Sequence, residues 1–260
     1  MKSKGGKIIS TSYEASAKVE MNEWRRKMSK NPSMTKTWTK GFQTKINQRI
    51  PERVHQTVAS AVRSMIETTL TGSDYVTTTE PLKEGTLKER EEKLEETIRN
   101  YKRTASIEGA GTGFGGVFLG MTDFPLLLAI KMRFLFTAAH LYGFDPVKME
   151  ERLFLLQIFQ MAFSGNKNKQ ETLARIDDWE GFTNDFPGAL TADEAMDWVT
   201  FQLEYRDFID VPKTLQLIPG FGAIVGATVN YHFLDLLGEA AKHCYRIRWF
   251  TDDRKNPAEG

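Results

Sequence analysis

The sequence predicts an all-α fold: a single helical bundle domain with a glycine-rich, quasi-repeated helix pair and an N-terminal helical arm. Three observations lead to this prediction. Apolar residues recur every three or four positions through most of the 260 residues, as on one face of a helix. No convincing run of alternating apolar and polar residues indicates strands. Two glycine-rich stretches, 107–145 and 220–230, match at a shift of 107 positions, which lays Asp123 on Asn230.

The chain is expected to divide near residue 50. Residues 1–50 are predicted to form a basic N-terminal arm that is partly disordered, and residues 51–255 a helical domain. Within the arm, disorder is expected over residues 1–12. Two helices are expected over 13–29 and 33–49, separated by a proline-containing break. Because the apolar faces of both helices are thin, the arm is predicted to dock loosely.

The first half of the domain is predicted to hold three helices. Pro51 suits the first turn of a helix with a buried stripe of Val54, Val58, Ala61, Met65 and Ile66. After a connection at 76–85, apolar spacing from residue 87 to 101 predicts a charged amphipathic helix with Glu91 on its solvent side. A break near Asp123 is expected to precede a helix over 124–141, with Asp123 as its N-cap.

The second half is predicted to be helical with two irregular segments. A helix over 149–163 is followed by a polar hinge at 164–169 and a helix over 170–179. Residues 181–190 read as an irregular apolar loop. A capping-box pattern at Thr191 opens a helix to residue 206, and a short segment covers 211–219. The last helix, 220–250, is long and is expected to close the core.

Composition places the chain among globular proteins able to bury a core, with 40% hydrophobic and 27% charged residues. The one cysteine, Cys244, excludes an internal disulfide and a multi-cysteine metal site, and it is expected to be an inert core thiol. The N-terminus lacks the apolar segment of a signal peptide. These features predict a cytoplasmic protein, with membrane association left open.

Charge is unevenly distributed although the net charge is +1. Residues 1–60 hold 13 Lys and Arg against 4 acids, a net +9, and residues 171–210 hold 2 against 11, a net −9. A basic arm of this kind favours anionic membrane lipid. It equally favours pairing with the acidic region of the same protein, with a second copy or with a protein partner. Nucleic acid is disfavoured because no nucleic-acid-binding motif accompanies the charge.

The glycines are interpreted as packing faces of helices. They lie on one side of each repeat, where a row of small residues lets another helix approach closely: Gly109, Gly113, Gly116 and Gly120 in the first, Gly222 and Gly226 in the second. A dinucleotide loop is disfavoured because a charged helical pattern, and no strand, precedes these glycines. Residues 109–130 reach the length of a membrane span, but Asp123 and Pro125 interrupt them.

The candidate site residues are polar groups within or beside these faces. Asp123 and Asn230 are interpreted as a helix cap and an inter-helix hydrogen bonder, with a ligand-linked role as the alternative. Lys131 and Arg133 lie in an apolar helix and are expected to pair with Asp123 or the acidic region. His140 is expected to pack near Tyr142.

A weaker candidate is a metal site on the last helix. Four residues lie on one face at spacings of three and four: His232, Asp235, Glu239 and His243. Lys242 and Arg246 share this face, which is typical of a solvated helix surface. No metal and no cofactor is therefore predicted.

Several motifs together resemble one family. They are the glycine run from Gly111 with Asp123 and Pro125, Tyr142-Gly143, the run Pro219-Gly-Phe-Gly-Ala, and a basic and aromatic end at 245–250. Over residues 53–250 the chain resembles the EcsC protein family. The resemblance implies a bacterial setting and a link to an ABC transporter, and it implies no established enzymatic activity.

The function predicted from these observations is that of a non-enzymatic bacterial protein. It would associate peripherally with membrane or with an apolar ligand and be linked to a transporter or secretion process. One alternative is a hydrolase-like enzyme with a site around Asp123. Another is a soluble protein–protein adaptor whose acidic region binds a basic partner.

Overall fold

A computed structural model describes residues 4–30, 52–72, 80–113, 124–184 and 222–251. All regular structure in these residues is helical, which confirms the all-α prediction. The helices are α1 (Lys4–Ser29), α3 (Glu52–Thr71), α4 (Leu87–Gly113), α6 (Phe124–Tyr142), α7 (Met149–Phe163), α8 (Asn166–Asp177), α9 (Trp179–Asn184) and α12 (Gly222–Thr251).

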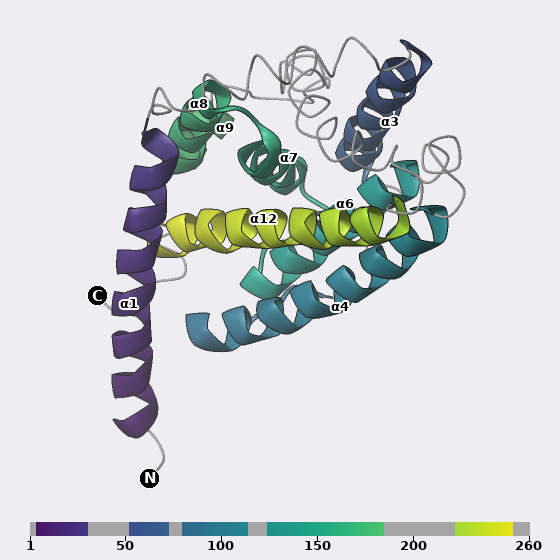
Figure 1. Ribbon diagram of the computed structural model, residues 1–260. Coiled ribbons are helices and arrows are strands. Elements are labelled where there is room, and N and C mark those ends of the chain that lie inside the picture. Colours follow the sequence, from purple (N-terminus) through teal and green to yellow (C-terminus); the bar gives the residue numbers. More distant parts are fainter. Residues whose placement is uncertain (1–3, 31–51, 73–79, 114–123, 185–221, 252–260) are drawn as a thin grey trace.

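The centre of the fold is the antiparallel pair of α4 and α12 (Figure 1). Four contacts define the register of the pair. In these contacts, decreasing residue numbers on α4 pair with increasing residue numbers on α12. They are Lys102 with Asp235, Ile98 with Gly238, Glu95 with Lys242 and Glu91 with Arg246. A Cβ atom on Gly238 would lie 2.6 Å from the Cδ1 atom of Ile98. A glycine at this position therefore lets the two helices approach closely.

The other helices surround this pair. α6 packs against both members, α7 packs against α12, and α3 packs against α6 and α7. α1 and α8 pack at the C-terminal end of α12, where α1 lies across the end of that helix (Figure 1). The core is rich in aromatic side chains, including the stacked rings of Tyr142 and Tyr245.

The glycine-rich stretch is divided differently from the prediction. α4 runs without interruption from the charged segment to Gly113, so the first glycines continue the charged helix that was predicted over residues 87–101. Gly109 and Gly113 lie near the end of α4, and Gly222 and Gly226 lie in the first turns of α12. These two helix ends lie together (Figure 1). The packing role of these glycines stays a prediction, and Gly116 and Gly120 lie outside the described residues.

The arm is more ordered than predicted in its first helix. α1 begins at Lys4, within the residues expected to be disordered, and it ends at Ser29 as predicted. It is docked on the bundle, because Ala17, Met21 and Trp24 are buried. The predicted helix over 33–49 lies outside the described residues, and the domain boundary at residue 50 stays a prediction.

Two boundaries in the second half also differ. α8 begins at Asn166, inside the predicted hinge, because the extended backbone of Ser164 and Gly165 is sufficient to end α7 and start the next helix. α9 occupies the start of the predicted loop at 181–190, where the Asp178 carboxylate accepts a hydrogen bond from the Gly181 N–H and supports the short helix. The segments predicted over 191–206 and 211–219 lie outside the described residues.

α4 begins at a reciprocal capping interaction that the sequence analysis overlooked. The Thr86 hydroxyl accepts a hydrogen bond from the Glu89 N–H, and the Glu89 carboxylate accepts one from the Thr86 N–H. These two bonds satisfy amide groups that the first helical turn leaves without partners. The threonine at 86 and the glutamate at 89 match the known pattern, so the sequence contained the signal.

Arg90 ties the start of α4 to the end of α6. Its buried guanidinium donates hydrogen bonds to the carbonyls of Gly85 (3.2 Å), Leu82 (3.1 Å) and Leu141 (2.8 Å). Arg90→Ala is expected to lower the free energy of unfolding by about 2 kcal/mol, because three partly buried carbonyl groups lose a charged donor. Urea denaturation measures this loss. Arg103→Ala on the exposed face of α4 is the control, with an expected change within about 0.5 kcal/mol.

Candidate functional site

The most unusual polar feature of the described residues is a buried ion pair between α4 and α12. Arg246 donates from Nε to Glu91 Oε1 and from Nη2 to Glu91 Oε2, both at 2.7 Å. Each residue is 1% exposed. This two-point geometry is the strong form of an arginine–carboxylate pair. Because the charges are removed from water, the pair is stable only while both members are present.

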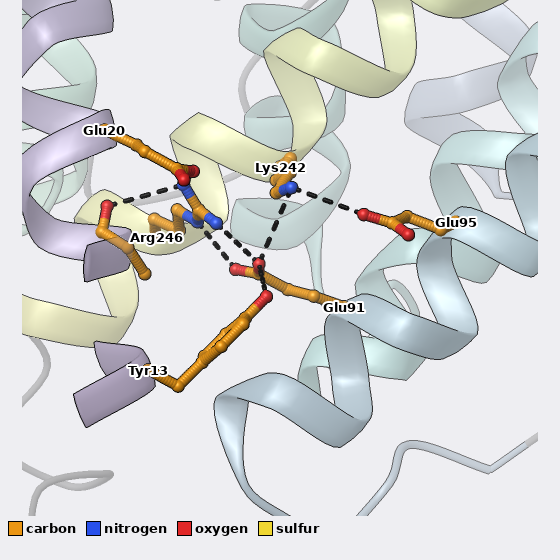
Figure 2. Close-up of polar contacts among 7 residues, drawn as sticks. Tyr13, Glu20, Glu91, Glu95, Lys242 and Arg246 are labelled. Atoms are coloured by element: carbon orange, nitrogen blue, oxygen red, sulfur yellow. Dashed lines mark hydrogen bonds and ion pairs between the residues drawn. The ribbon is translucent and has the colours of Figure 1, made fainter. Parts of the chain in front are cut away.

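α1 contributes further hydrogen-bonding groups to this ion pair (Figure 2). The Tyr13 hydroxyl donates to Glu91 Oε2 at 2.7 Å, and Arg246 Nη1 donates to Glu20 Oε2 at 2.8 Å. The carbonyl oxygen of Ala17 accepts a further bond from Nη1 at 3.4 Å. We call this group, together with Lys242 and Glu95, the arm-docking cluster. It holds three helices at one point.

Lys242 lies at the open edge of the arm-docking cluster. Its Nζ is 3.5 Å from Glu95 Oε1 and 3.9 Å from Glu91 Oε2 (Figure 2). Both oxygens of Glu91 therefore already face cationic or hydroxyl donors. A carboxylate engaged in this way is poorly suited to accept a proton from a substrate. The geometry fits a role in positioning α1 better than a role in acid–base chemistry.

The ionisation of the cluster is consistent with this role. Burial and the hydrogen bond to Glu91 raise the pKa of Tyr13, so its hydroxyl stays a donor. The hydrogen bond from Arg246 lowers the pKa of Glu20 and keeps its carboxylate charged. Burial alone would lower the pKa of Arg246, but the bonds and charge of Glu91, with those of Glu20, raise it.

His243 lies beside the cluster, stacked under the indole of Trp24. The ring centroids are 4.9 Å apart and the planes differ by 13°. Burial, followed by the charges of Arg246 and Lys242, lowers the pKa of His243 to about 3. The imidazole is therefore neutral at physiological pH. The predicted solvated face was wrong at His243 and Arg246, because α1 covers this part of α12.

The remaining residues of the weak metal candidate do not converge. His232, Asp235 and Glu239 are exposed, whereas His243 is buried under Trp24. Asp235 pairs with Lys102, whose ammonium also lies 3.9 Å from the centre of the Tyr231 ring. Within the described residues, no group of three or more His, Cys, Asp or Glu is arranged to hold a metal ion.

The polar candidates on α6 have separate environments. Lys131 is buried and donates to the Leu127 carbonyl at 3.3 Å, with its ammonium 5.6 Å from the centre of the Phe233 ring. Arg133 is exposed on α6, and its expected pairing with Asp123 or the acidic region stays a prediction. Asp123 lies outside the described residues, and the side chain of Asn230 on α12 is not described. Their roles stay predictions.

His140 and Cys244 are both buried. The backbone carbonyl of His140 accepts a hydrogen bond from the Leu82 N–H, and burial lowers the pKa of its imidazole. Burial raises the pKa of the Cys244 thiol, which favours the protonated form. The predicted core position of Cys244 is confirmed, and its inertness stays a prediction.

A second buried ion pair fixes α12 to α7. Arg248 donates to Glu151 with Nη1 at 2.6 Å and Nη2 at 2.9 Å. Its guanidinium also lies 3.7 Å from the centre of the Phe144 ring and 4.5 Å from that of Phe154. The basic and aromatic end at 245–250 is therefore part of the core, with two arginines facing different helices.

Sequence reasoning placed Glu91 on the solvent side of α4 and missed its partner. A signal was present, because Glu91 lies between Leu87 and Leu94 at the spacing of the buried stripe, four residues after one and three before the other. A charged residue at such a position indicates a buried partner. The sequence did not identify that partner, since Arg246 lies 155 residues away.

Among the described helices, none is long and apolar enough to cross a membrane. The stretch at 109–130, which reached the length of a span, belongs partly to α4 and partly to α6.

Comparisons with known proteins identify relatives. Residues 15–250 match the model of the EcsC protein family. Protein EcsC of Bacillus subtilis (strain 168) is 43% identical over 229 residues, which cover 88% of this chain and 93% of the relative. The uncharacterized protein YdbA of the same organism is 29% identical over 150 residues, covering 58% of this chain and 54% of the relative. No solved structure matches.

Proposed function

The chain belongs to the EcsC protein family, and from this premise we propose that it attaches peripherally to anionic membranes through the basic outer face of α1. The observation that carries the proposal is the composition of that face. Four cationic residues are exposed along it: Lys18, Arg26, Lys27 and, directly after the helix, Lys30. Val19 is 59% exposed among them.

The docked position of α1 supports this orientation. Its apolar residues Ala17, Met21 and Trp24 face the bundle, and Arg26 lies on the opposite side of the helix. Lys18 and Lys27 are exposed at the edges between these two faces, where Lys18 Nζ lies 5.7 Å from the centre of the Phe250 ring. Two acidic neighbours are partly engaged: Glu20 binds Arg246, and Glu23 lies 4.0 Å from Arg26. The face therefore presents a net positive charge to a planar surface.

The acidic region neutralises part of the arm. Arg25 Nη2 lies 2.6 Å from Asp177 Oδ2, and Gln170 Nε2 donates to the Ser29 carbonyl at 2.8 Å. Pairing of the arm with the acidic region of the same chain thus occurs at Arg25. The four exposed cations are other residues, and their exposure makes them available to an anionic surface.

The expected strength comes from the number of these cations. A Lys or Arg near an anionic leaflet contributes about 1 kcal/mol to binding, and the attraction decreases within a Debye length. Four exposed cations are enough for reversible, salt-sensitive attachment. A role beside a transporter or in secretion is compatible with such attachment and is part of the proposal. The alternative of an enzyme around Asp123 stays a prediction.

Reversal of three of these charges tests the proposal. In a liposome flotation assay, Arg26→Glu, Lys27→Glu and Lys30→Glu together are expected to weaken binding to anionic vesicles at least roughly 100-fold, at about 1 kcal/mol for each lost contact. The matched control is Lys93→Glu, Arg99→Glu and Arg103→Glu on the exposed face of α4, with the same change in net charge.

The control is expected to bind like the native protein, and high salt is expected to release both. A native protein that is indifferent to anionic lipid would overturn the proposal. Equal loss in the control would show that overall charge, and not the face of α1, is responsible.

A further inference from the structure

The docking of α1 depends on a small interface. Among the described residues of α1, the buried apolar side chains are those of Ala17, Met21 and Trp24. Its polar contacts join Tyr13 to Glu91, Glu20 to Arg246, Arg25 to Asp177 and Ser29 to Gln170. The α4–α12 pair makes its own contacts, from Lys102 with Asp235 to Glu91 with Arg246. Release of α1 would leave these contacts in place.

One titratable residue lies at the centre of this interface. Trp24 covers the ring of His243, which is 9% exposed, and Nδ1 of that ring has no hydrogen-bond partner in the described structure. A neutral ring tolerates this position under an indole. A protonated ring would place a charge and a second N–H donor in a site that offers no acceptor.

The charges around His243 oppose its protonation. On α12 itself Lys242 and Arg246 are cationic, and α1 contributes Lys27 against one anion, Glu20. The other packed elements bring anions that are already paired. Glu91 and Glu95 of α4 bind Arg246 and Lys242, and Asp177 of α8 binds Arg25.

We propose that His243 makes α1 a releasable arm, which undocks on protonation and offers its apolar face to the bilayer. The released helix carries Tyr13, Met21, Trp24 and Met28 on one side, with Lys18, Arg25 and Lys27 flanking them. A basic amphipathic helix of this kind lies in a membrane interface. This inference rests on the proposed function, because an anionic surface attracts both the arm and protons.

The direction of the pH effect follows from linkage. In the docked state the pKa of His243 is about 3, and in the undocked state it returns toward its ordinary 6.5. Docking is therefore fully retained above pH 6.5 and is lost as the pH falls below it. At pH 5 the undocked ring is protonated in roughly 30 of 31 molecules, and the docking equilibrium weakens roughly 30-fold.

Hydrogen–deuterium exchange of the full chain without lipid tests the release. Protection of residues 13–29, corrected for the intrinsic effect of pH, is expected to fall roughly 30-fold between pH 7.5 and 5.0. Protection of α7 is expected to change much less. His243→Phe keeps a ring to stack on Trp24 and cannot bind a proton, so it is expected to remove the dependence on pH.

His243→Asn, which also cannot ionise in this range, provides the same readout if the phenylalanine variant folds poorly. Unchanged protection of α1 at pH 5.0 in the native chain would overturn the inference. So would an equal fall in both variants, because that would assign the release to other groups. Since no lipid is present, these results are separate from the flotation assay that tests membrane attachment.

A second flotation experiment connects release to the membrane. At pH 5.0, binding of the native protein to anionic vesicles is expected to become resistant to high salt, because apolar residues of α1 enter the interface. Binding of His243→Phe is expected to stay salt-sensitive at that pH. Salt-sensitive binding of both proteins would contradict insertion of the released arm.

Discussion

Arg246→Ala is expected to lower the free energy of unfolding by about 3–5 kcal/mol, because it leaves the Glu91 carboxylate buried without its cation. Glu91 and Arg246 are each 1% exposed and joined by two bonds of 2.7 Å. Lys242, at 3.9 Å, is too distant to replace the guanidinium. Urea denaturation measures the loss, with the slope as a check that unfolding stays two-state.

Two further variants make this test specific. Tyr13→Phe removes a single hydroxyl bond to Glu91 and is expected to lose about 1 kcal/mol. Glu91→Leu combined with Arg246→Met removes both charges and is expected to recover most of the stability lost in Arg246→Ala. A loss below about 1 kcal/mol in Arg246→Ala would show that the pair behaves as an exposed one.

Arg248→Ala is expected to have a comparable effect, a loss of about 3–5 kcal/mol, through a different pair of helices. It removes two hydrogen bonds to Glu151 and the contacts of the guanidinium with the Phe144 and Phe154 rings. Thermal or urea unfolding measures the loss. Since Arg248 joins α12 to α7, local protection of α1 should fall no further than global stability does.

Arg248→Lys separates charge from geometry. Lysine keeps a positive charge near Glu151, but it cannot form the two parallel bonds or lie flat on the Phe144 ring. The free energy of unfolding of Arg248→Lys is expected to lie between those of the native protein and Arg248→Ala. A lysine variant as stable as the native chain would show that charge alone is sufficient at this position.

The comparison of Arg246→Ala with Arg248→Ala also bears on the function. Both variants lose a buried pair, but Arg246 alone of the two contacts α1, through Glu20 and Ala17. A protein in which α1 is a separate, releasable element should show early exchange of residues 13–29 in Arg246→Ala. This behaviour would support an arm that moves while the rest of the bundle stays folded.

Local sequence signals were sufficient for most helices. The apolar spacing of α7 predicted its bounds at 149 and 163, and the break before α6 was predicted at Asp123 and Pro125. These features depend on neighbours within one or two turns of helix, so they can be read from a short window. Errors occurred where a tertiary contact stabilises a short or polar segment, as at α9.

The family was also evident in the sequence, since its motifs are combinations of residue types at short spacing. The all-α class, the strongly basic arm and the core position of Cys244 were determined by composition and helical periodicity. The register of α4 on α12 was not determined by the sequence, and it is known only from the four contacts between these helices. The apolar face of a helix indicates which of its residues are buried, but it does not indicate which other helix covers them.

The arm-docking cluster is what the tertiary structure alone decided. Glu91, Arg246 and Tyr13 are separated by 78 residues or more along the chain, and each has a plausible solvated role when its own helix is considered. Whether a charged side chain is buried depends on the helix that covers it, and the sequence of that side chain's own helix does not contain this information. The packing of α1 across α12 turned an apparently solvated face into the junction of three helices.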